Sequence, residues 1–169
     1  MSSKNSNIFG LLKVKVQKGI NLAIRDTVSS DPYVVASIDD LRVKTRVVKR
    51  NCNPAWNEDL NLPIKNITRP VTLTVYDKDT FTGDDKMGEA EFSFTKLVEC
   101  IRMGLKDLPD GTSVDRVQPS ENNCLSKESC VVWNNGKMTQ DLRLKLKNVE
   151  CGELEIQIEW VHVEGAKGL

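Results

Sequence analysis

Alternation of apolar and polar residues with a period of two is the feature that most constrains the fold of this chain. In the stretch from Leu154 to Trp160 every second residue is apolar, and the residues between them are Glu or Gln. Residues 12–16 and 142–146 follow the same pattern. Because successive side chains of a strand point to opposite faces, each stretch predicts a strand with one buried and one solvated face. The chain is therefore predicted to be all-β.

Five further stretches have strand character, which brings the predicted count to eight strands in an antiparallel sandwich. These stretches are residues 32–38, 41–48, 59–64, 71–76 and 90–94. Tight turns are expected at Asp39-Asp40 and at Asn134-Asn135-Gly136, where residues that tolerate positive φ stand together. With 169 residues and no run of eighteen apolar residues, the chain is expected to form one domain over residues 1–169, without a membrane span.

Residues 96–136 interrupt the strand pattern and are predicted to be an insertion between two parts of the domain core, residues 8–95 and 137–164. The insertion is much longer than the ~2–5 residues of a hairpin loop. Leu97, Ile101, Leu105 and Leu108 recur at helical spacing before Pro109, so a short helix is expected. The remainder is expected to form an extra hairpin or another ordered excursion. Both an inert and a functional insertion remain open.

Composition excludes several classes of function. The 24 basic and 24 acidic residues give a formal net charge of +0, which argues against nucleic-acid binding. Five cysteines without a C-x-x-C pair, and a start without an apolar signal region, indicate the cytoplasm or nucleus. His162 is the one histidine, and neither a nucleophile motif nor a P-loop accompanies it. We therefore expect no enzymatic activity.

Two acidic loops follow predicted strands. The first contains Asp26 and Asp31, and the second contains Asp77, Asp79 and Asp85. If the loops meet at one end of a sheet, their carboxylates repel one another until they are protonated or bind a cation. Oxygen ligands without His or Cys favour calcium over zinc, and crowded carboxylates suit the 6–8 ligands of calcium better than the octahedron of magnesium. The alternative is that these residues only cap turns.

Basic and apolar residues near these loops suggest contact with an anionic membrane. Arg42, Lys44 and Arg46 share one face of the predicted strand 41–48, and each can contribute about 1 kcal/mol toward an anionic leaflet. An ordinary solvated strand face is the alternative. At the loop tips, Val28 and Phe81 are the apolar residues able to enter the interface, unless Phe81 packs inward. Bound calcium would reverse the local repulsion of anionic lipid and act as an electrostatic switch.

Three motifs in order give the chain a family resemblance. Residues 30–34 read Ser-Asp-Pro-Tyr-Val, residues 53–58 read Asn-Pro-Ala-Trp-Asn-Glu, and the second acidic loop has the spacing Asp77-x-Asp79-x5-Asp85-x2-Gly88. Together they resemble a C2 domain. The long insertion and the ending at residues 149–156 more narrowly resemble the plant C2-domain abscisic-acid-related (CAR) proteins. This resemblance implies an eight-stranded antiparallel C2 β-sandwich of type II topology, with calcium loops at one end.

The resemblance also implies a role for individual residues. For one or two calcium ions it implies five side-chain ligands, namely Asp26, Asp31, Asp77, Asp79 and Asp85. Backbone carbonyls of Arg25 and Lys78 are expected to complete the shell. For a phosphoinositide groove it implies two basic and two aromatic residues, namely Lys44, Arg46, Tyr33 and Tyr76.

The function implied by the resemblance is that of a calcium-dependent peripheral adaptor at the plasma membrane. It would bind phosphatidylserine or phosphoinositide and recruit soluble abscisic acid receptors of the PYR/PYL/RCAR type, which would positively regulate abscisic acid signalling. The insertion carries Ile101, Met103 and Trp133, residue types that supply contact area at interfaces, and is expected to bind the protein partner. The alternative is a regulator that activates a small or unconventional GTPase in trans.

Overall fold

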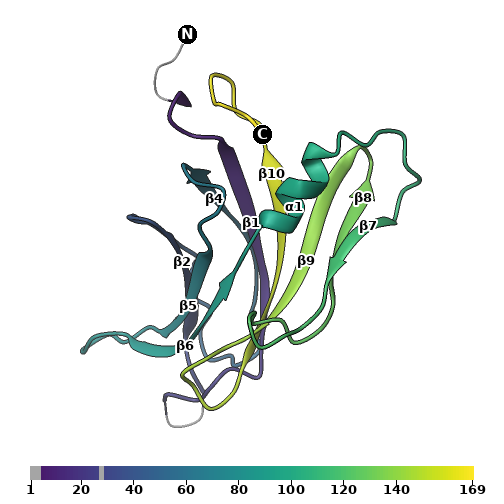
Figure 1. The fold of residues 1–169 in the computed structure, drawn as a ribbon. Helices are drawn as coiled ribbons and strands as arrows, with labels where there is room; N and C mark the ends of the chain where they lie inside the picture. Colours follow the sequence, from purple (N-terminus) through teal and green to yellow (C-terminus); the bar gives the residue numbers. More distant parts are fainter. Residues whose placement is uncertain (1–4, 27–28) are drawn as a thin grey trace.

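The computed structural model describes residues 5–26 and 29–169 as two antiparallel sheets packed face to face (Figure 1). One sheet has six strands in the order β4-β1-β10-β9-β8-β7, and the other has four in the order β3-β2-β5-β6. The strands are β1 (Gly10–Ile20), β2 (Pro32–Ile38), β3 (Leu41–Lys44), β4 (Ala55–Ile64), β5 (Val71–Asp77), β6 (Asp85–Phe92), β7 (Thr112–Val117), β8 (Ser129–Asn134), β9 (Lys137–Lys145) and β10 (Glu153–Val161). The all-β sandwich predicted from the sequence is confirmed.

All eight predicted strands are present, and the insertion adds β7 and β8 at the β9 edge of the larger sheet. β1 lies between β4 and β10 and pairs with both in antiparallel register. The last strand therefore lies beside the first, as the expected type II topology requires. The two predicted turns are also confirmed, because Asp39, Asn135 and Gly136 adopt positive φ.

The core lies between the sheets and is built by the alternation seen in the sequence. The inner face of β1 contributes Leu12, Val14 and Val16, all fully buried. Trp56 at the start of β4 is also buried, and its indole nitrogen donates a hydrogen bond to the Pro32 carbonyl oxygen at 3.3 Å. This bond ties the start of β2 to the opposite sheet, which fixes the position of the acidic loop that precedes β2.

The predicted helix is present but shorter than its apolar spacing suggested. α1 spans Thr95–Arg102 and buries Leu97 toward the core. Leu105 and Leu108, which continue the helical period, lie beyond its end. The helix ends because Gly104, the residue after the C-cap Met103, adopts a positive φ of 66°, a conformation that an α-helix cannot contain. Asp107 also has positive φ, 57°, so the residues that follow do not resume the helix. Among the described residues, no helix is long and apolar enough to cross a membrane.

Candidate metal site

Three carboxylates converge at one end of the sandwich, which lies at the bottom of Figure 1. Asp26 lies in the loop after β1, Asp31 directly precedes β2, and Asp77 is the last residue of β5. One ligand oxygen from each lies within 4.8 Å of the others. β2 and β5 are paired neighbours, with Pro32 opposite Asp77, so strand register brings two loops distant in sequence together. We call these three residues the carboxylate cluster.

Backbone hydrogen bonds orient the carboxylate cluster. The Asp31 N–H donates to Asp77 Oδ1 at 2.8 Å, and the Arg50 N–H donates to Asp31 Oδ1 at 2.7 Å. The Lys78 N–H donates to the Asp31 carbonyl oxygen at 3.0 Å, which holds Lys78 beside the cluster. In both Asp31 and Asp77 these bonds are accepted by Oδ1, so the backbone fixes how the two carboxylates are oriented.

Burial makes the cluster electrostatically unfavourable when it is empty and ionised. Asp77 is only 3% exposed. Its burial raises the pKa of the Asp77 carboxyl, and the negative charges of Asp26, Asp31 and Asp85 raise it further against the opposing hydrogen bond from the Asp31 N–H. A raised pKa means that the folded protein disfavours the charged form. A bound cation would remove this penalty.

The geometry of the cluster fits a calcium ion. Oxygens that share one calcium ion lie about 2.3–2.6 Å from it, so two of them can be at most about 5.2 Å apart. The 4.8 Å limit of the cluster meets this condition. The donor atoms are all carboxylate oxygens, which hard divalent cations prefer. When bound, calcium would supply positive charge and open coordination positions at this end of the sandwich.

The remaining predicted ligands lie close by in different settings. The Asp79 carboxylate accepts hydrogen bonds from its own loop, from Thr82 Oγ1 at 2.7 Å and from the Phe81 N–H at 3.0 Å, and these bonds lower its pKa. Asp85 lies directly opposite Asp77 in the pairing of β5 with β6. The structure thus brings three of the five predicted side-chain ligands together and places Asp85 beside them. The ligand roles of all five aspartates, and those of the Arg25 and Lys78 carbonyls, stay predictions.

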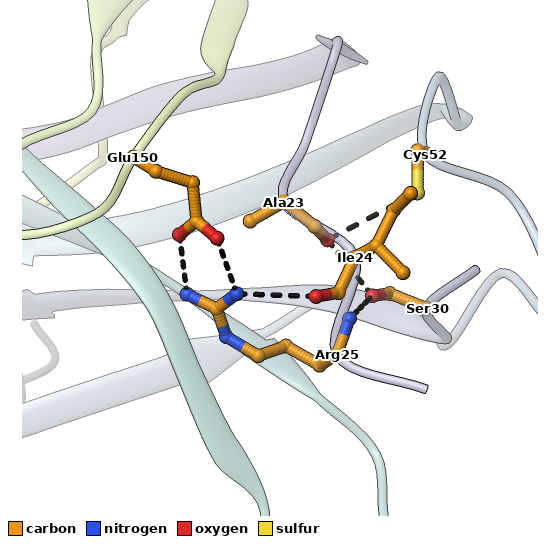
Figure 2. A network of polar contacts seen from close by, with 6 residues as sticks. All are labelled: Ala23, Ile24, Arg25, Ser30, Cys52 and Glu150. Carbon is orange, nitrogen blue, oxygen red and sulfur yellow. Dashed lines mark hydrogen bonds and ion pairs between the residues drawn. The ribbon is translucent and has the colours of Figure 1, made fainter. Parts of the chain in front are cut away.

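A polar network anchors the first acidic loop (Figure 2). The Arg25 guanidinium donates two hydrogen bonds to the Glu150 carboxylate, at 2.9 and 2.8 Å, and lowers the pKa of Glu150 to about 2. The Arg25 N–H donates to Ser30 Oγ at 2.8 Å, and Ser30 Oγ donates to the Ala23 carbonyl oxygen at 2.8 Å. No sequence signal pointed to Glu150, because it lies 125 positions from Arg25.

Both predicted aromatic residues and one of the two predicted basic residues line a shallow groove on the smaller sheet. The rings of Tyr33 and Tyr76 stack with centroids 5.5 Å apart, and Lys44 Nζ lies 6.0 Å from the Tyr33 centroid. The tyrosine groove, as we call it, is lined by Tyr33, Val35, Arg42, Lys44, Tyr76 and Asp84. The Tyr33 hydroxyl donates to the Asp84 carboxylate, and burial together with this bond raises the pKa of Tyr33 to about 12.

Arg46 lies outside the lining of the tyrosine groove. β3 ends at Lys44, and the Arg46 guanidinium instead lies 3.7 Å from Glu58 Oε1 and donates to the Ala55 carbonyl oxygen at 3.4 Å. Arg42 lines the groove beside Lys44. Its position two residues before Lys44 on the same strand face was the sequence signal for this placement.

The apolar residues expected to contact a membrane or a protein partner differ in exposure. Phe81 is 94% exposed at the tip of its loop, so the alternative that it packs inward is excluded. Val28 lies outside the described residues. In the insertion, Met103 is 60% exposed, whereas Ile101 and Trp133 are partly buried and line one shallow hollow.

Comparison with known proteins identifies the family. The model of the C2 domain family matches residues 10–108. Protein C2-DOMAIN ABA-RELATED 10 of Arabidopsis thaliana is 56% identical over 162 residues, which covers 95% of this chain and 90% of that protein. GTPase activating protein 1 of Oryza sativa subsp. indica is 47% identical over 163 residues, which covers 96% of this chain and 98% of that protein.

Solved structures share the fold at low sequence identity. A calcium-bound pair of C2 domains from Extended-Synaptotagmin 2 superposes with a TM-score of 0.61 at 19% identity, over 92% of this chain and 46% of that one. A single C2 domain of plant Extended Synaptotagmin 1 gives a TM-score of 0.60 at 20% identity, over 92% and 97%. The fold, the family match and the identity along nearly the whole length establish that this chain belongs to the C2-domain family and, within it, to the plant C2-domain ABA-related proteins.

Proposed function

We propose that this protein binds calcium at the carboxylate cluster and then docks on anionic phospholipid as a peripheral membrane adaptor. The observation that carries the proposal is the convergence of Asp26, Asp31 and the buried Asp77 within 4.8 Å. Acidic clusters of this kind are costly for the protein when they are empty, because the charges repel and Asp77 is removed from water. A bound divalent cation would compensate this repulsion, so we interpret the cluster as a cation site.

The switch follows from the charges. The three carboxylates of the cluster carry a formal charge of 3 × (−1) = −3, one calcium ion changes it to −1, and a second changes it to +1. A partly coordinated ion can take phosphate or carboxylate oxygens of a lipid as its remaining ligands. Repulsion of an anionic surface thereby becomes attraction, and calcium acts as an electrostatic switch.

Two neighbouring features would strengthen membrane contact. Burial of the exposed Phe81 in the interface would contribute up to about 1.5–3 kcal/mol. Arg42 and Lys44 of the tyrosine groove would each contribute about 1 kcal/mol near an anionic leaflet, and the groove has the basic and aromatic character that suits a phosphoinositide headgroup. The lipid classes we propose are therefore phosphatidylserine and phosphoinositide, at the plasma membrane.

Sedimentation with vesicles tests this function. The protein should pellet with phosphatidylserine-containing vesicles in calcium and stay in the supernatant with chelator. The double variant Asp26→Asn with Asp77→Asn should lose the calcium-dependent fraction, because it removes two of the three carboxylates. Asp107→Asn, an exposed carboxylate in the insertion, is the matched control and should behave as the unmodified protein. Calcium-dependent pelleting of the double variant would contradict the proposal.

We further propose that the cargo is a soluble abscisic acid receptor, which the protein brings to the membrane, with the nucleus as a further compartment. The support is the name of the 56% identical Arabidopsis relative, C2-DOMAIN ABA-RELATED 10, and the exposed Met103 on the insertion, away from the carboxylate cluster. Met103→Glu should weaken receptor binding and leave calcium-dependent lipid binding intact. Phe81→Ser should do the opposite. If Met103→Glu instead abolished lipid binding, the assignment of the two surfaces would be wrong.

A second candidate function is activation of a GTPase, favoured by the name of the rice relative, GTPase activating protein 1, at 47% identity. The protein itself would supply an arginine in trans to stabilise the charge that develops during GTP hydrolysis. GTP turnover by a candidate plant GTPase, measured with and without this protein, separates this role from pure recruitment. An unchanged turnover would leave recruitment as the function.

A further inference from the structure

The tyrosine groove carries charges of both signs. Its lining contains Arg42 and Lys44 of β3, and also Asp84, which directly precedes β6. Lys44 Nζ lies 6.0 Å from the centroid of the Tyr33 ring, and the hydroxyl at the tip of the same ring donates to the Asp84 carboxylate. A headgroup bound beside Tyr33 therefore meets two cations and one anion.

Asp84 is held in the groove by three contacts. Its Oδ1 accepts a hydrogen bond from the Asp79 N–H at 2.9 Å, and its Oδ2 accepts the one from the Tyr33 hydroxyl. Lys78 Nζ lies 3.7 Å from the same Oδ2. Because moving the carboxylate out of the groove would break all three contacts, Asp84 is a fixed part of the lining.

The Asp84 carboxylate is also within reach of a bound molecule. Its side chain is 18% exposed, and it lines the groove. An ionised carboxylate has about four acceptor positions and no donor. The Asp79 N–H and the Tyr33 hydroxyl use two of them. A ligand group beside Asp84 must therefore donate a hydrogen bond, which suits a hydroxyl and disfavours a phosphate.

The basic side of the groove balances a single phosphate. Among the residues that the structure describes, Arg42 and Lys44 are the two basic ones in the lining. A phosphate monoester carries a charge of about −1.5 to −2 at neutral pH, which these two cations can neutralise. A second phosphate would find no further cation in the lining, because Lys78 is paired with Asp84 and lies outside it.

The size of the groove suits a headgroup built on a six-membered ring. The groove holds about 480 Å³, within the range of about 300–1,000 Å³ for small-molecule sites. The stacked rings of Tyr33 and Tyr76 form part of its wall. A ring that carries hydroxyls on one side and one phosphate on the other matches the charges of this wall.

We propose that Asp84 determines headgroup specificity in the tyrosine groove. It accepts hydrogen bonds from the ring hydroxyls of a membrane phosphoinositide with one ring phosphate, and it repels the second ring phosphate of a bisphosphorylated lipid. This inference rests on the phosphoinositide site of the proposed function and adds a choice among the phosphoinositides.

Vesicle binding in chelator tests the specificity without any contribution from calcium. The vesicles contain phosphatidylcholine with an equal fraction of either phosphatidylinositol 4-phosphate or phosphatidylinositol 4,5-bisphosphate. The unmodified protein should bind the bisphosphate no more tightly than the monophosphate. Asp84→Asn should strengthen bisphosphate binding about tenfold, the effect of removing one charge at ~6 Å in water from a phosphate with two charges. It should change monophosphate binding by less than about threefold.

Two control variants separate the charge of Asp84 from its structural role. Asp84→Glu keeps the charge and should show no preference for the bisphosphate, as in the unmodified protein. Asp107→Asn removes an equal charge from the exposed surface of the insertion, outside the groove, and should also behave as the unmodified protein. Equal gains for both lipids in Asp84→Asn, or a bisphosphate gain in Asp84→Glu, would overturn the proposal.

Soluble headgroups distinguish failure of this inference from failure of the groove itself. Inositol 1,4-bisphosphate and inositol 1,4,5-trisphosphate are titrated while the ring NMR signals of Tyr33 and Tyr76 are followed. If neither headgroup shifts these signals, with or without Asp84→Asn, the groove is not a phosphoinositide site and both proposals fail. If both headgroups shift them and the ratio of affinities is the same in both proteins, only the role of Asp84 fails. Selective binding of soluble headgroups without vesicle binding would contradict a membrane lipid as the ligand.

Discussion

Replacing Asp77 with Asn should stabilise the protein in the absence of calcium. Asn has the same shape, so its Oδ1 can still accept the hydrogen bond from the Asp31 N–H. The substitution removes a charge that lies within 4.8 Å of both Asp26 and Asp31. At 4.8 Å, two unit charges repel by about 1 kcal/mol in water and by about 3.5 kcal/mol at an effective dielectric constant of ~20.

The lower repulsion energy, about 1 kcal/mol for each pair of charges, suits this site, because solvent reaches Asp26 and part of Asp31. Two relieved repulsions then give about 2 kcal/mol, from which the weaker neutral hydrogen bond subtracts up to about 1 kcal/mol. The remaining ~1–2 kcal/mol corresponds to a rise in Tm of about 2–8 °C for a domain of this size. Because the pKa of Asp77 is raised, the unmodified protein loses this stability as pH rises through that pKa. The difference between the two proteins should therefore disappear in acid, where the carboxyl is protonated.

In the presence of calcium, the unmodified protein should be more stable than the Asp77→Asn variant. Calcium affinity depends on the number of ligand charges, and losing one of three carboxylates should weaken binding by at least about 100-fold, or ~2.7 kcal/mol. Scanning calorimetry in chelator and in millimolar calcium measures both effects, with Asp107→Asn as the matched control. A lower Tm in chelator together with a normal calcium-induced rise would refute the electrostatic reasoning.

Three further predictions concern neighbouring features of the molecule. The double variant Arg42→Ala with Lys44→Ala should reduce binding to phosphoinositide vesicles more than binding to phosphatidylserine vesicles. Arg46→Ala should have a smaller effect, because Arg46 pairs with Glu58 outside the groove. Equal losses for both lipids would mean that the groove acts only through its general positive charge. Glu150→Gln should weaken calcium binding several-fold in calorimetric titration, because the first loop loses its charged tether; unchanged affinity would show that the tether has no such role. Ser30→Ala should lower the free energy of unfolding in urea by about 1–3 kcal/mol, since the partly buried Arg25 N–H loses its acceptor; no change would mean that water replaces the hydroxyl.

The strands of the sandwich could be predicted because their alternation is local. The helix end could not, because Leu105 and Leu108 continue the apolar period while Gly104 and Asp107 turn the backbone to positive φ. The hairpin of β7 and β8 was expected only in outline. Its strands have no clean alternation, and the register shifts between Ser113 and Asp115.

The candidate site shows the same division between local and tertiary information. The alternation placed both acidic loops directly after strands, but it was the C2 resemblance that implied that Asp26, Asp31 and Asp77 share one site. In the structure these three residues lie at one end of the sandwich. Spacing could not show that the Asp79 carboxylate bonds to its own loop. It also could not reveal Glu150, whose contact with Arg25 exists only after folding.

A crystal structure with calcium and a short-chain phosphatidylserine would test the central claim most directly. We predict a calcium ion about 2.3–2.6 Å from carboxylate oxygens of Asp26, Asp31 and Asp77, with lipid headgroup oxygens completing its coordination shell. A lipid bound without contact to the ion, or an ion bound away from these three residues, would contradict the proposed switch.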